Sequence, residues 1–186
     1  MKNIKYNLIK LKKMEVKMNL LNKLFGYFTQ TKDKIKVVDI SSPIDGEIIS
    51  LEEIPDEAFA AGVIGDGVGI IPDENSSIIY APCNSELSSI FDTLHAISIE
   101  VQELELIIHF GIDTVNLRGK GFTKLKDGEK IKKGEKLIKY DLNYIKENAK
   151  SICTPVVIAN MEKVDRIEKK SGKVKAGDLL MRVYLK

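Results

Sequence analysis

From Val37 onward the sequence is a succession of short β-branched stretches separated by Gly, Pro and Asp-Gly turns. Strands this short and this regularly interrupted are typical of an all-β sandwich or barrel. The stretches are VVDI, GEIISL, GVGII, SSIIYAP, HAISIEV, LELIIHF, KLIKYDL, TPVVIA and LLMRVYL. A clear helical pattern occurs only in DLNYIKENAK, with Asp141 as its N-cap, and a further helical turn is expected after Asn160. We therefore predict a compact antiparallel β-sandwich or barrel with a few short helical turns.

Two internal repeats indicate that the β motif is duplicated. SPIDGEIISL (42–51) resembles APCNSELSSI (81–90), and KIKKGEKLIKY (130–140) resembles KVKAGDLLMRVY (173–184). The second pair reads as a basic strand, a tight turn that needs Gly, and an apolar strand. Chance similarity in a lysine-rich chain is the alternative, although it must then account for both repeats.

The N-terminal tail is strongly basic. Residues 1–40 hold ten Lys and three acidic residues, a net charge of 10 − 3 = +7, whereas the whole chain carries +2, so the remainder carries 2 − 7 = −5. Apolar residues recur at helical spacing over residues 18–28, which predicts a short amphipathic helix. We expect a basic tail with this helix and a linker over residues 1–36, and one domain over residues 37–186.

The overall composition excludes several classes of protein. A net charge of +2 from 29 basic and 27 acidic residues does not indicate nucleic-acid binding. Cys83 and Cys153 are too few and too far apart for a disulfide framework, and we expect two partly buried thiols. No apolar run approaches the roughly 20 residues that span a bilayer, and no signal peptide is evident. A cytoplasmic protein is expected.

The chain has only two histidines, His95 and His109, and they flank one predicted β-hairpin. In that hairpin AISIEV and LELIIHF are joined by a turn at residues 102–103. The midpoint of 95 and 109 falls at this apex, so a turn centred there places the imidazoles opposite or nearly opposite on neighbouring strands. Opposed residues have Cβ atoms roughly 4.5–5.5 Å apart, which lets the two rings meet edge to edge. A functional pair and two structural histidines both fit this pattern.

The surrounding residues narrow the chemistry that these histidines can perform. No G-x-S-x-G or comparable nucleophile signature is present, and GDGVG (65–69) lacks the G-K-[ST] ending of a phosphate-binding loop. A catalytic zinc site usually takes three protein ligands, and two histidines fourteen residues apart make a poor set. What remains is an imidazole that acts as a nucleophile toward phosphorus.

Three blocks of sequence carry a likeness to a known family. HFGIDTVNLRGKGF (109–122), APCNSELSSIFDTLHAISI (81–99) and TPVVIANM (154–161) closely resemble the glucose-family enzyme IIA component of the phosphoenolpyruvate-dependent sugar phosphotransferase system. The likeness runs from about Val38 to the C-terminus. The family's fold, a compact antiparallel β-sandwich built from a duplicated motif, agrees with the internal repeats.

The resemblance implies specific roles for three residues. His109 accepts a phosphoryl group from the phosphohistidine of the carrier HPr and passes it to a cysteine on the IIB domain of a membrane sugar permease. His95 donates an N–H to the phosphate oxygens, and Thr93 fixes the tautomer of His95. Phosphoryl transfer spreads negative charge over the equatorial oxygens, so fixed donors are the help that it needs. Main-chain N–H groups of the GIDTV turn are further candidates. No cofactor or metal is implied.

Five more residues match the family's partner-binding surface. Asp56 and Asp113 match acidic positions that receive an arginine of the carrier, and turn-forming Asp residues are the alternative. Phe59, Phe91 and Val115 match an apolar rim where both partners dock, and ordinary core residues are the alternative.

Other functions stay open at this point. A zinc hydrolase on a related β fold and a regulatory binding module without a transport role are the two rivals. The basic tail resembles a short helix that some members place on anionic membranes, with residues 18–28 as the contact. Translation from Met18, with residues 1–17 outside the native protein, is an alternative. The sequence does not reveal the sugar.

Overall fold

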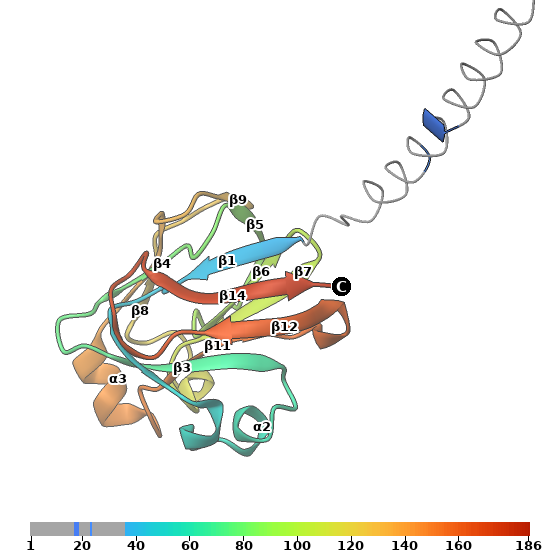
Figure 1. Ribbon diagram of the computed structural model, residues 1–186. Coiled ribbons are helices and arrows are strands. Elements are labelled where there is room, and N and C mark those ends of the chain that lie inside the picture. The colour runs from blue at the N-terminus through green and yellow to red at the C-terminus, as the bar shows by residue number, and fades with distance from the viewer. Residues whose placement is uncertain (1–16, 19–22, 24–35) are drawn as a thin grey trace, which may run out of the picture. The chain divides into compact units, whose positions relative to one another are not determined.

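The computed structural model describes residues 17–18, 23 and 36–186 of the 186-residue chain (Figure 1). The predicted amphipathic helix over residues 18–28 therefore lies outside the described residues, apart from Met18 and Lys23. The chain divides between Ile35 and Lys36, and the assignment of separate roles to the two parts stays a prediction. No helix within the described part of the chain is long and apolar enough to cross a membrane.

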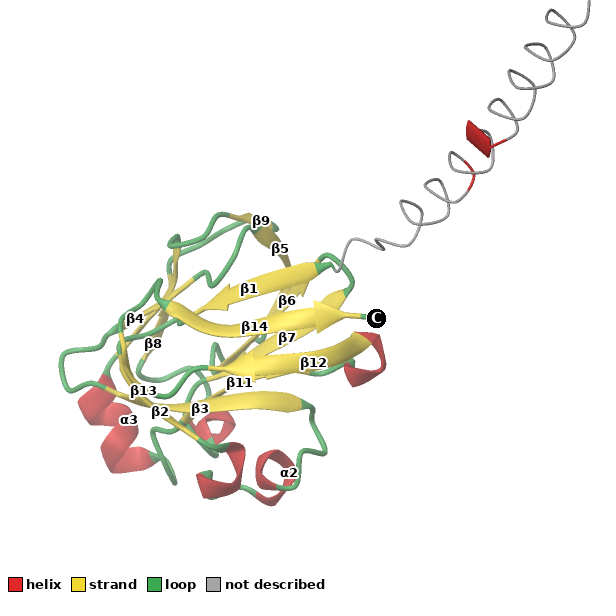
Figure 2. Ribbon diagram, viewed as in Figure 1, coloured by secondary structure: helices red, strands yellow, loops and turns green. Residues whose placement is uncertain are grey.

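Residues 36–186 form three antiparallel sheets, which Figure 2 shows in yellow. The largest has the order β13–β2–β3–β11–β7–β6–β5–β9, and the two smaller ones have the orders β1–β14–β12 and β4–β10–β8. The bounds of the large sheet are β13 (Gly172–Val174), β2 (Gly46–Ile49), β3 (Asp66–Pro72), β11 (Thr154–Ile158), β7 (Leu104–His109), β6 (Ala96–Val101), β5 (Ser85–Ile90) and β9 (Lys130–Ile131). The others are β1 (Val37–Ser41), β14 (Leu179–Leu185), β12 (Val164–Lys169), β4 (Ile78–Tyr80), β10 (Lys136–Tyr140) and β8 (Phe122–Lys124).

One apolar core joins the three sheets, because alternate residues of each strand point inward. Ile97 and Ile99 of β6 and Met181 and Val183 of β14 are fully buried and belong to the same cluster. The predicted β-sandwich is confirmed, and each of the nine predicted stretches contains a strand. The prediction missed β5, β8 and β12. In β12 only Val164 is buried, because backbone pairing with β14 holds this edge strand in place without an apolar pattern.

The short helices follow the expected capping chemistry. The helix predicted at DLNYIKENAK is α3 (Leu142–Asn148), and the Asp141 carboxylate accepts a hydrogen bond of 3.0 Å from the Tyr144 backbone N–H. The turn predicted after Asn160 is η3 (Met161–Lys163). The other short elements are η1 (Leu51–Glu53), α2 (Glu57–Ala60) and η2 (Thr114–Leu117).

The strand pairing repeats in the two halves of the duplicated motif. Ile40 of β1 pairs with Met181 of β14, and Ile79 of β4 pairs with Ile138 of β10. In both strand pairs the register shifts at the residue next to these paired isoleucine and methionine positions. The repeated stretches of sequence therefore form the same pattern of strand pairing, including the shift in register.

The two glycine turns of the repeat are held by equivalent side chains. The Asp45 carboxylate accepts a hydrogen bond of 2.7 Å from the Ala176 N–H, and the Asn84 side-chain oxygen accepts one of 2.9 Å from the Lys133 N–H. The strands beside each turn do not pair with one another, because β13 and β9 join the large sheet whereas β14 and β10 join the small ones. Each turn is thus a corner between sheets and not a hairpin.

Three glutamates lie directly opposite one another across neighbouring strands. Glu86 of β5 pairs with Glu100 of β6, which pairs with Glu105 of β7, and all three are exposed. None of them forms an ion pair with another described residue. Like charges placed opposite one another destabilise a sheet. We call these three residues the glutamate row.

Replacing the central member of the glutamate row should stabilise the domain. We expect Glu100→Gln to raise the free energy of unfolding by about 0.5 kcal/mol at low ionic strength, because it removes two cross-strand repulsions. Urea denaturation measures this change, and Glu74→Gln, a loop substitution, is the matched control. Added salt should shrink the difference. No gain at low salt, or a gain unaffected by salt, contradicts the explanation.

Candidate functional site

The hairpin that carries the histidines is the predicted one, but its register differs by one residue. Val101 pairs with Leu104 across a turn at Gln102–Glu103, and His109 pairs with Ala96 instead of His95. A two-residue turn centres the pairing between residues 102 and 103, and not on 102 itself. The prediction that the histidines are opposite or nearly opposite is therefore confirmed as near opposition, with an offset of one residue.

The two imidazoles nevertheless meet, because the chain turns sharply just before β6. Leu94 adopts a left-handed conformation with φ of 57°, and the His95 carbonyl accepts a hydrogen bond of 2.7 Å from the Phe110 N–H. His95 directly precedes β6, and its ring lies against that of His109. The ring centroids are 4.9 Å apart at an interplanar angle of 83°. The contact between the rings that was inferred from the sequence is confirmed, and its geometry is T-shaped.

The hydrogen bond to His109 determines which of its ring nitrogens is free. Nδ1 of His109 lies 2.8 Å from the carbonyl oxygen of Gly111. A carbonyl can only accept, so Nδ1 carries the proton in the neutral ring and Nε2 carries the lone pair. The free nucleophilic atom is therefore Nε2.

Gly111 is the functional residue that sequence reasoning missed. Its φ is 71°, and a Cβ at this position would lie 2.5 Å from Cγ2 of Thr114 and 2.8 Å from the carbonyl oxygen of Ser151. Only glycine can present its carbonyl to His109 here. The sequence does contain a signal for this role, because a glycine stands two residues after His109, just after a predicted strand.

Two hydrogen bonds fix the position of the loop that follows β7. The Thr114 hydroxyl donates to the Phe110 carbonyl at 2.7 Å, and the Ile112 N–H donates to the Ser151 carbonyl at 2.7 Å. The Ile112 N–H was one of the main-chain donors suggested for phosphate, and it is already used. The loop therefore serves as a rigid support for the Gly111 carbonyl.

Thr93 orients the second histidine. Its hydroxyl oxygen lies 2.5 Å from Nδ1 of His95. A hydroxyl can donate or accept. When it donates to Nδ1, Nε2 of His95 becomes an N–H donor beside the free Nε2 of His109. The arrangement can thus supply one nucleophilic nitrogen and one neutral donor.

Both imidazoles are kept uncharged near neutral pH. Burial, together with a smaller effect of the neighbouring His109, lowers the pKa of His95 to about 4. Burial also lowers the pKa of His109, opposed by the Gly111 hydrogen bond and by the charges of Asp56 and Asp113. A lone pair on His109 is therefore available at pH 7.

The predicted acidic residues lie near His109 in different local settings. The Asp56 carboxylate caps α2, accepting hydrogen bonds from the N–H groups of Ala58 and Phe59 at 3.0 and 3.1 Å. Asp113 is exposed, adopts a left-handed conformation with φ of 62° and makes no side-chain cap bond to η2. Asp56 therefore also has the structural role that was its alternative.

The three predicted rim residues divide into two groups. Phe91 and Val115 are 48% and 47% exposed, and the Phe91 ring lies 5.6 Å from the His95 ring. Phe59 is only 4% exposed, which differs from the expected exposed rim, because it packs with Ile54 and Val157 in a second apolar cluster. Its ring lies 5.4 Å from that of His109. Phe59 thus packs against His109 as a buried neighbour.

The rival function of a zinc hydrolase would require a metal site. Among the residues that the structure describes, no three His, Cys, Asp or Glu side chains are placed to hold a metal ion together. Cys83 and Cys153 are both buried, as predicted, and burial raises the pKa of each thiol. The donor set of the site is therefore two imidazoles and nearby carboxylates.

The low pKa of His95 gives a direct test of this geometry. We expect its ring resonances to keep their neutral positions as the pH falls from about 8 to about 5, whereas an ordinary histidine titrates near 6.5. Unfolding restores the ordinary pKa, so the associated stability is present above pH 6.5 and is lost as the pH falls toward 4. NMR titration of the ring protons measures this, with His95→Gln to assign the signals. A midpoint near 6.5 contradicts the described packing.

Comparison with known proteins gives a consistent result. The family described as "phosphoenolpyruvate-dependent sugar phosphotransferase system, EIIA 1" matches residues 38–164. The PTS system glucose-specific EIIA component of Borreliella burgdorferi is 45% identical over 143 residues, covering 76% of this chain and 75% of that protein. The component of the same name from Haemophilus influenzae is 44% identical over 163 residues, covering 87% and 95%.

A solved structure agrees with the sequence matches. Glucose permease IIA from Mycoplasma capricolum has a TM-score of 0.72 and 32% sequence identity, over 79% of this chain and 96% of that chain. The family match covers well over half of the chain and includes both histidines. The chain therefore belongs to the EIIA 1 family of the phosphoenolpyruvate-dependent sugar phosphotransferase system.

Proposed function

We propose that His109 is the phosphoacceptor through which this EIIA component acts. As a member of its family, the chain is a phosphotransferase component that carries phosphoryl groups in sugar uptake. In our proposal, Nε2 of His109 takes the group from the phosphohistidine of HPr and gives it to a cysteine of the IIB domain of a sugar permease. The observation that supports this most directly is the bond from Nδ1 to the Gly111 carbonyl, which leaves Nε2 free.

The transfer step balances without loss of a proton from His109. A bond forms between Nε2 and phosphorus while the nitrogen–phosphorus bond of the donor breaks. Positive charge develops on the His109 ring, which keeps its Nδ1 proton. The Gly111 carbonyl and the charges of Asp56 and Asp113 favour that positive charge, because each of them raises the pKa of the ring.

His95 is the proposed donor to the transferred group. Its Nε2–H, set by Thr93, would face the equatorial oxygens, where negative charge is spread during transfer. A neutral donor fixed in place needs no reorganisation as the reaction proceeds. Because the pKa of His95 is about 4, it stays neutral at the pH of the reaction.

Partner docking would use the face on which His109 lies. Phe91 and Val115 supply exposed apolar area, and Asp56 and Asp113 would pair with an arginine of the carrier. The glutamate row lies on the same face. Alternate residues of a strand point to the same side of the sheet, so Glu105 and His109 of β7 share a side. Such a charge pattern favours a basic partner, so loading should slow as salt rises.

The two rival functions have weaker support. A zinc hydrolase needs a third ligand beside the histidine pair, and the described residues supply no such group. A regulatory module without transport would still accept a phosphoryl group but would not deliver it. The relatives are named for glucose-specific transport, which favours the carrier role.

The basic tail is proposed to make weak contacts with an anionic membrane surface on the cytoplasmic side. Its sequence supports this, since residues 1–40 carry a net charge of +7 and include an apolar helical pattern over residues 18–28. Co-sedimentation with phosphatidylglycerol vesicles tests the proposal. Equal sedimentation of a chain that lacks residues 1–36 would contradict it.

Phosphorylation with purified partners tests the assigned roles. Incubation with phosphoenolpyruvate, enzyme I and HPr should add one phosphoryl group, acid-labile and base-stable, as measured by intact mass. We expect His109→Gln to abolish the addition, because no other imidazole is placed as the nucleophile. We expect His95→Gln to accept the group but to fail in delivery to a IIB domain.

Two results would contradict these roles. Loading of His109→Gln to the level of the native chain would remove His109 as the acceptor. Onward transfer by His95→Gln at the native rate would remove His95 as the stabilising donor. Circular dichroism of both variants controls for folding.

A further inference from the structure

Two adjoining cavities lie away from the histidine pair and share the segment Asn75–Ser77 as a common wall. The larger has a volume of about 460 Å³ and is closed by the start of β8, the end of β10 and the start of α3. The smaller has a volume of about 350 Å³ and reaches the glycine turns at Gly134 and Gly177. Volumes of this size are those of small-molecule sites.

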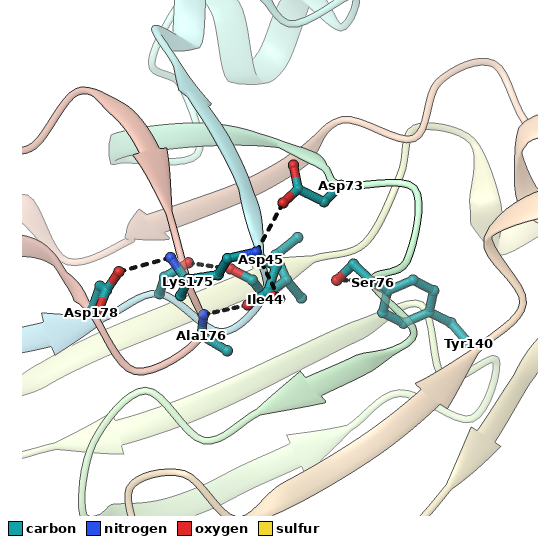
Figure 3. A network of polar contacts seen from close by, with 9 residues as sticks. Ile44, Asp45, Asp73, Ser76, Tyr140, Lys175, Ala176 and Asp178 are labelled. Atoms are coloured by element: carbon teal, nitrogen blue, oxygen red, sulfur yellow. Dashed lines mark hydrogen bonds and ion pairs between the residues drawn. The ribbon is translucent and has the colours of Figure 1, made fainter.

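A buried pair of hydroxyls, on Ser76 and Tyr140, lines the larger cavity, and Figure 3 shows the two residues next to each other. The Tyr140 hydroxyl lies 2.6 Å from Oγ of Ser76, and the two residues are only 2% and 8% exposed. Each of the two hydroxyl groups carries one hydrogen atom, and the hydrogen bond between them uses only one of these two. No other described side chain accepts the second hydrogen, so the pair can donate to an atom in the cavity.

The walls of the larger cavity supply further uncommitted polar groups. Asn75, Ser77, Thr123 and Asn143 line it, and none of their side chains makes a hydrogen bond to another described residue. Amides and hydroxyls both donate and accept. The rings of Phe122 and Tyr140 add apolar area at its base.

The charges around the cavities favour a neutral occupant. The carboxylate of Asp141 is held by the Tyr144 N–H, and that of Asp45 is held by the Ala176 N–H and by Lys175, as Figure 3 shows for Asp45. The remaining charges of the larger cavity, Glu74 and Lys139, are of opposite sign. They form no cluster of one sign, so the lining offers a strongly charged ligand no group of like-charged side chains.

We propose that the larger cavity binds a neutral polyhydroxylated molecule of about the size of a six-carbon polyol. Its hydroxyls would accept from the Ser76–Tyr140 pair and exchange hydrogen bonds with the amide and hydroxyl side chains of the wall. The site shares no residue with the histidine pair, so the proposal does not depend on phosphoryl transfer.

Amide NMR of the full chain tests the proposal with myo-inositol and D-glucose as neutral probes. We expect saturable shifts centred on Asn75, Thr123 and Asn143, with a dissociation constant in the range of about 1–10 mM. Thr123→Val, which keeps the shape and removes the hydroxyl, and Asn143→Leu should each weaken binding at least about tenfold, equivalent to about 1.4 kcal/mol. Ser171→Ala, at an exposed position outside the cavity, should leave binding unchanged.

Several results would overturn the proposal. Shifts that grow linearly without saturation, or that spread evenly over the surface, would show that no site is present. Equal binding by Thr123→Val and Asn143→Leu would place the probe elsewhere. Stronger shifts with inorganic phosphate or free lysine than with the neutral probes would refute the assigned ligand class. Spectra that coincide away from the cavity confirm that the variants are folded.

Discussion

The hydrogen bond from Nδ1 of His109 to the Gly111 carbonyl is the interaction on which the site depends. It decides the tautomer of the ring and therefore which nitrogen keeps the lone pair that the proposed function requires. The bond requires a left-handed residue without a side chain at position 111, because Thr114 and Ser151 occupy the space where a Cβ would lie. The chemistry of one imidazole is thus set by the backbone of the loop that follows its strand.

The duplicated fold explains why this loop is where it is. In one copy of the motif β3 pairs with β2 and β11, and in the other β6 pairs with β5 and β7. The two copies meet where Ile108 of β7 pairs with Val156 of β11, one residue before His109.

The loops at this junction differ between the copies. The short β5–β6 loop brings Thr93 and His95 to His109 from one side. The longer β2–β3 loop brings α2, with Asp56 and Phe59, from the other side. A symmetric scaffold therefore carries an asymmetric site.

Much of this arrangement could be predicted from local sequence patterns. The strands, the Asp141 cap and the turn at residues 102–103 each have a signal within a few residues. The one-residue offset of the histidines arose because the two-residue turn centres the strand pairing between Gln102 and Glu103 and not on Gln102. The sequence left a rim position and a core position open for Phe59, because the choice depends on contacts with Val157, far away in the sequence.

The glutamate row is another feature that local sequence patterns do not predict. Glu86, Glu100 and Glu105 become neighbours only once two strand registers are known. Like charges placed opposite one another lower stability, and here they lie on the face that carries His109. Such a cost to stability is consistent with the proposed use of this face for docking.

The most direct test of the account is to identify the ring nitrogen that carries phosphorus. Phosphorylated protein labelled with ¹⁵N at histidine shows a one-bond coupling between phosphorus and the nitrogen to which it is attached. The account predicts this coupling on Nε2 of His109, with Nδ1 still protonated and bonded to the Gly111 carbonyl. Coupling to Nδ1, or to either nitrogen of His95, would contradict it.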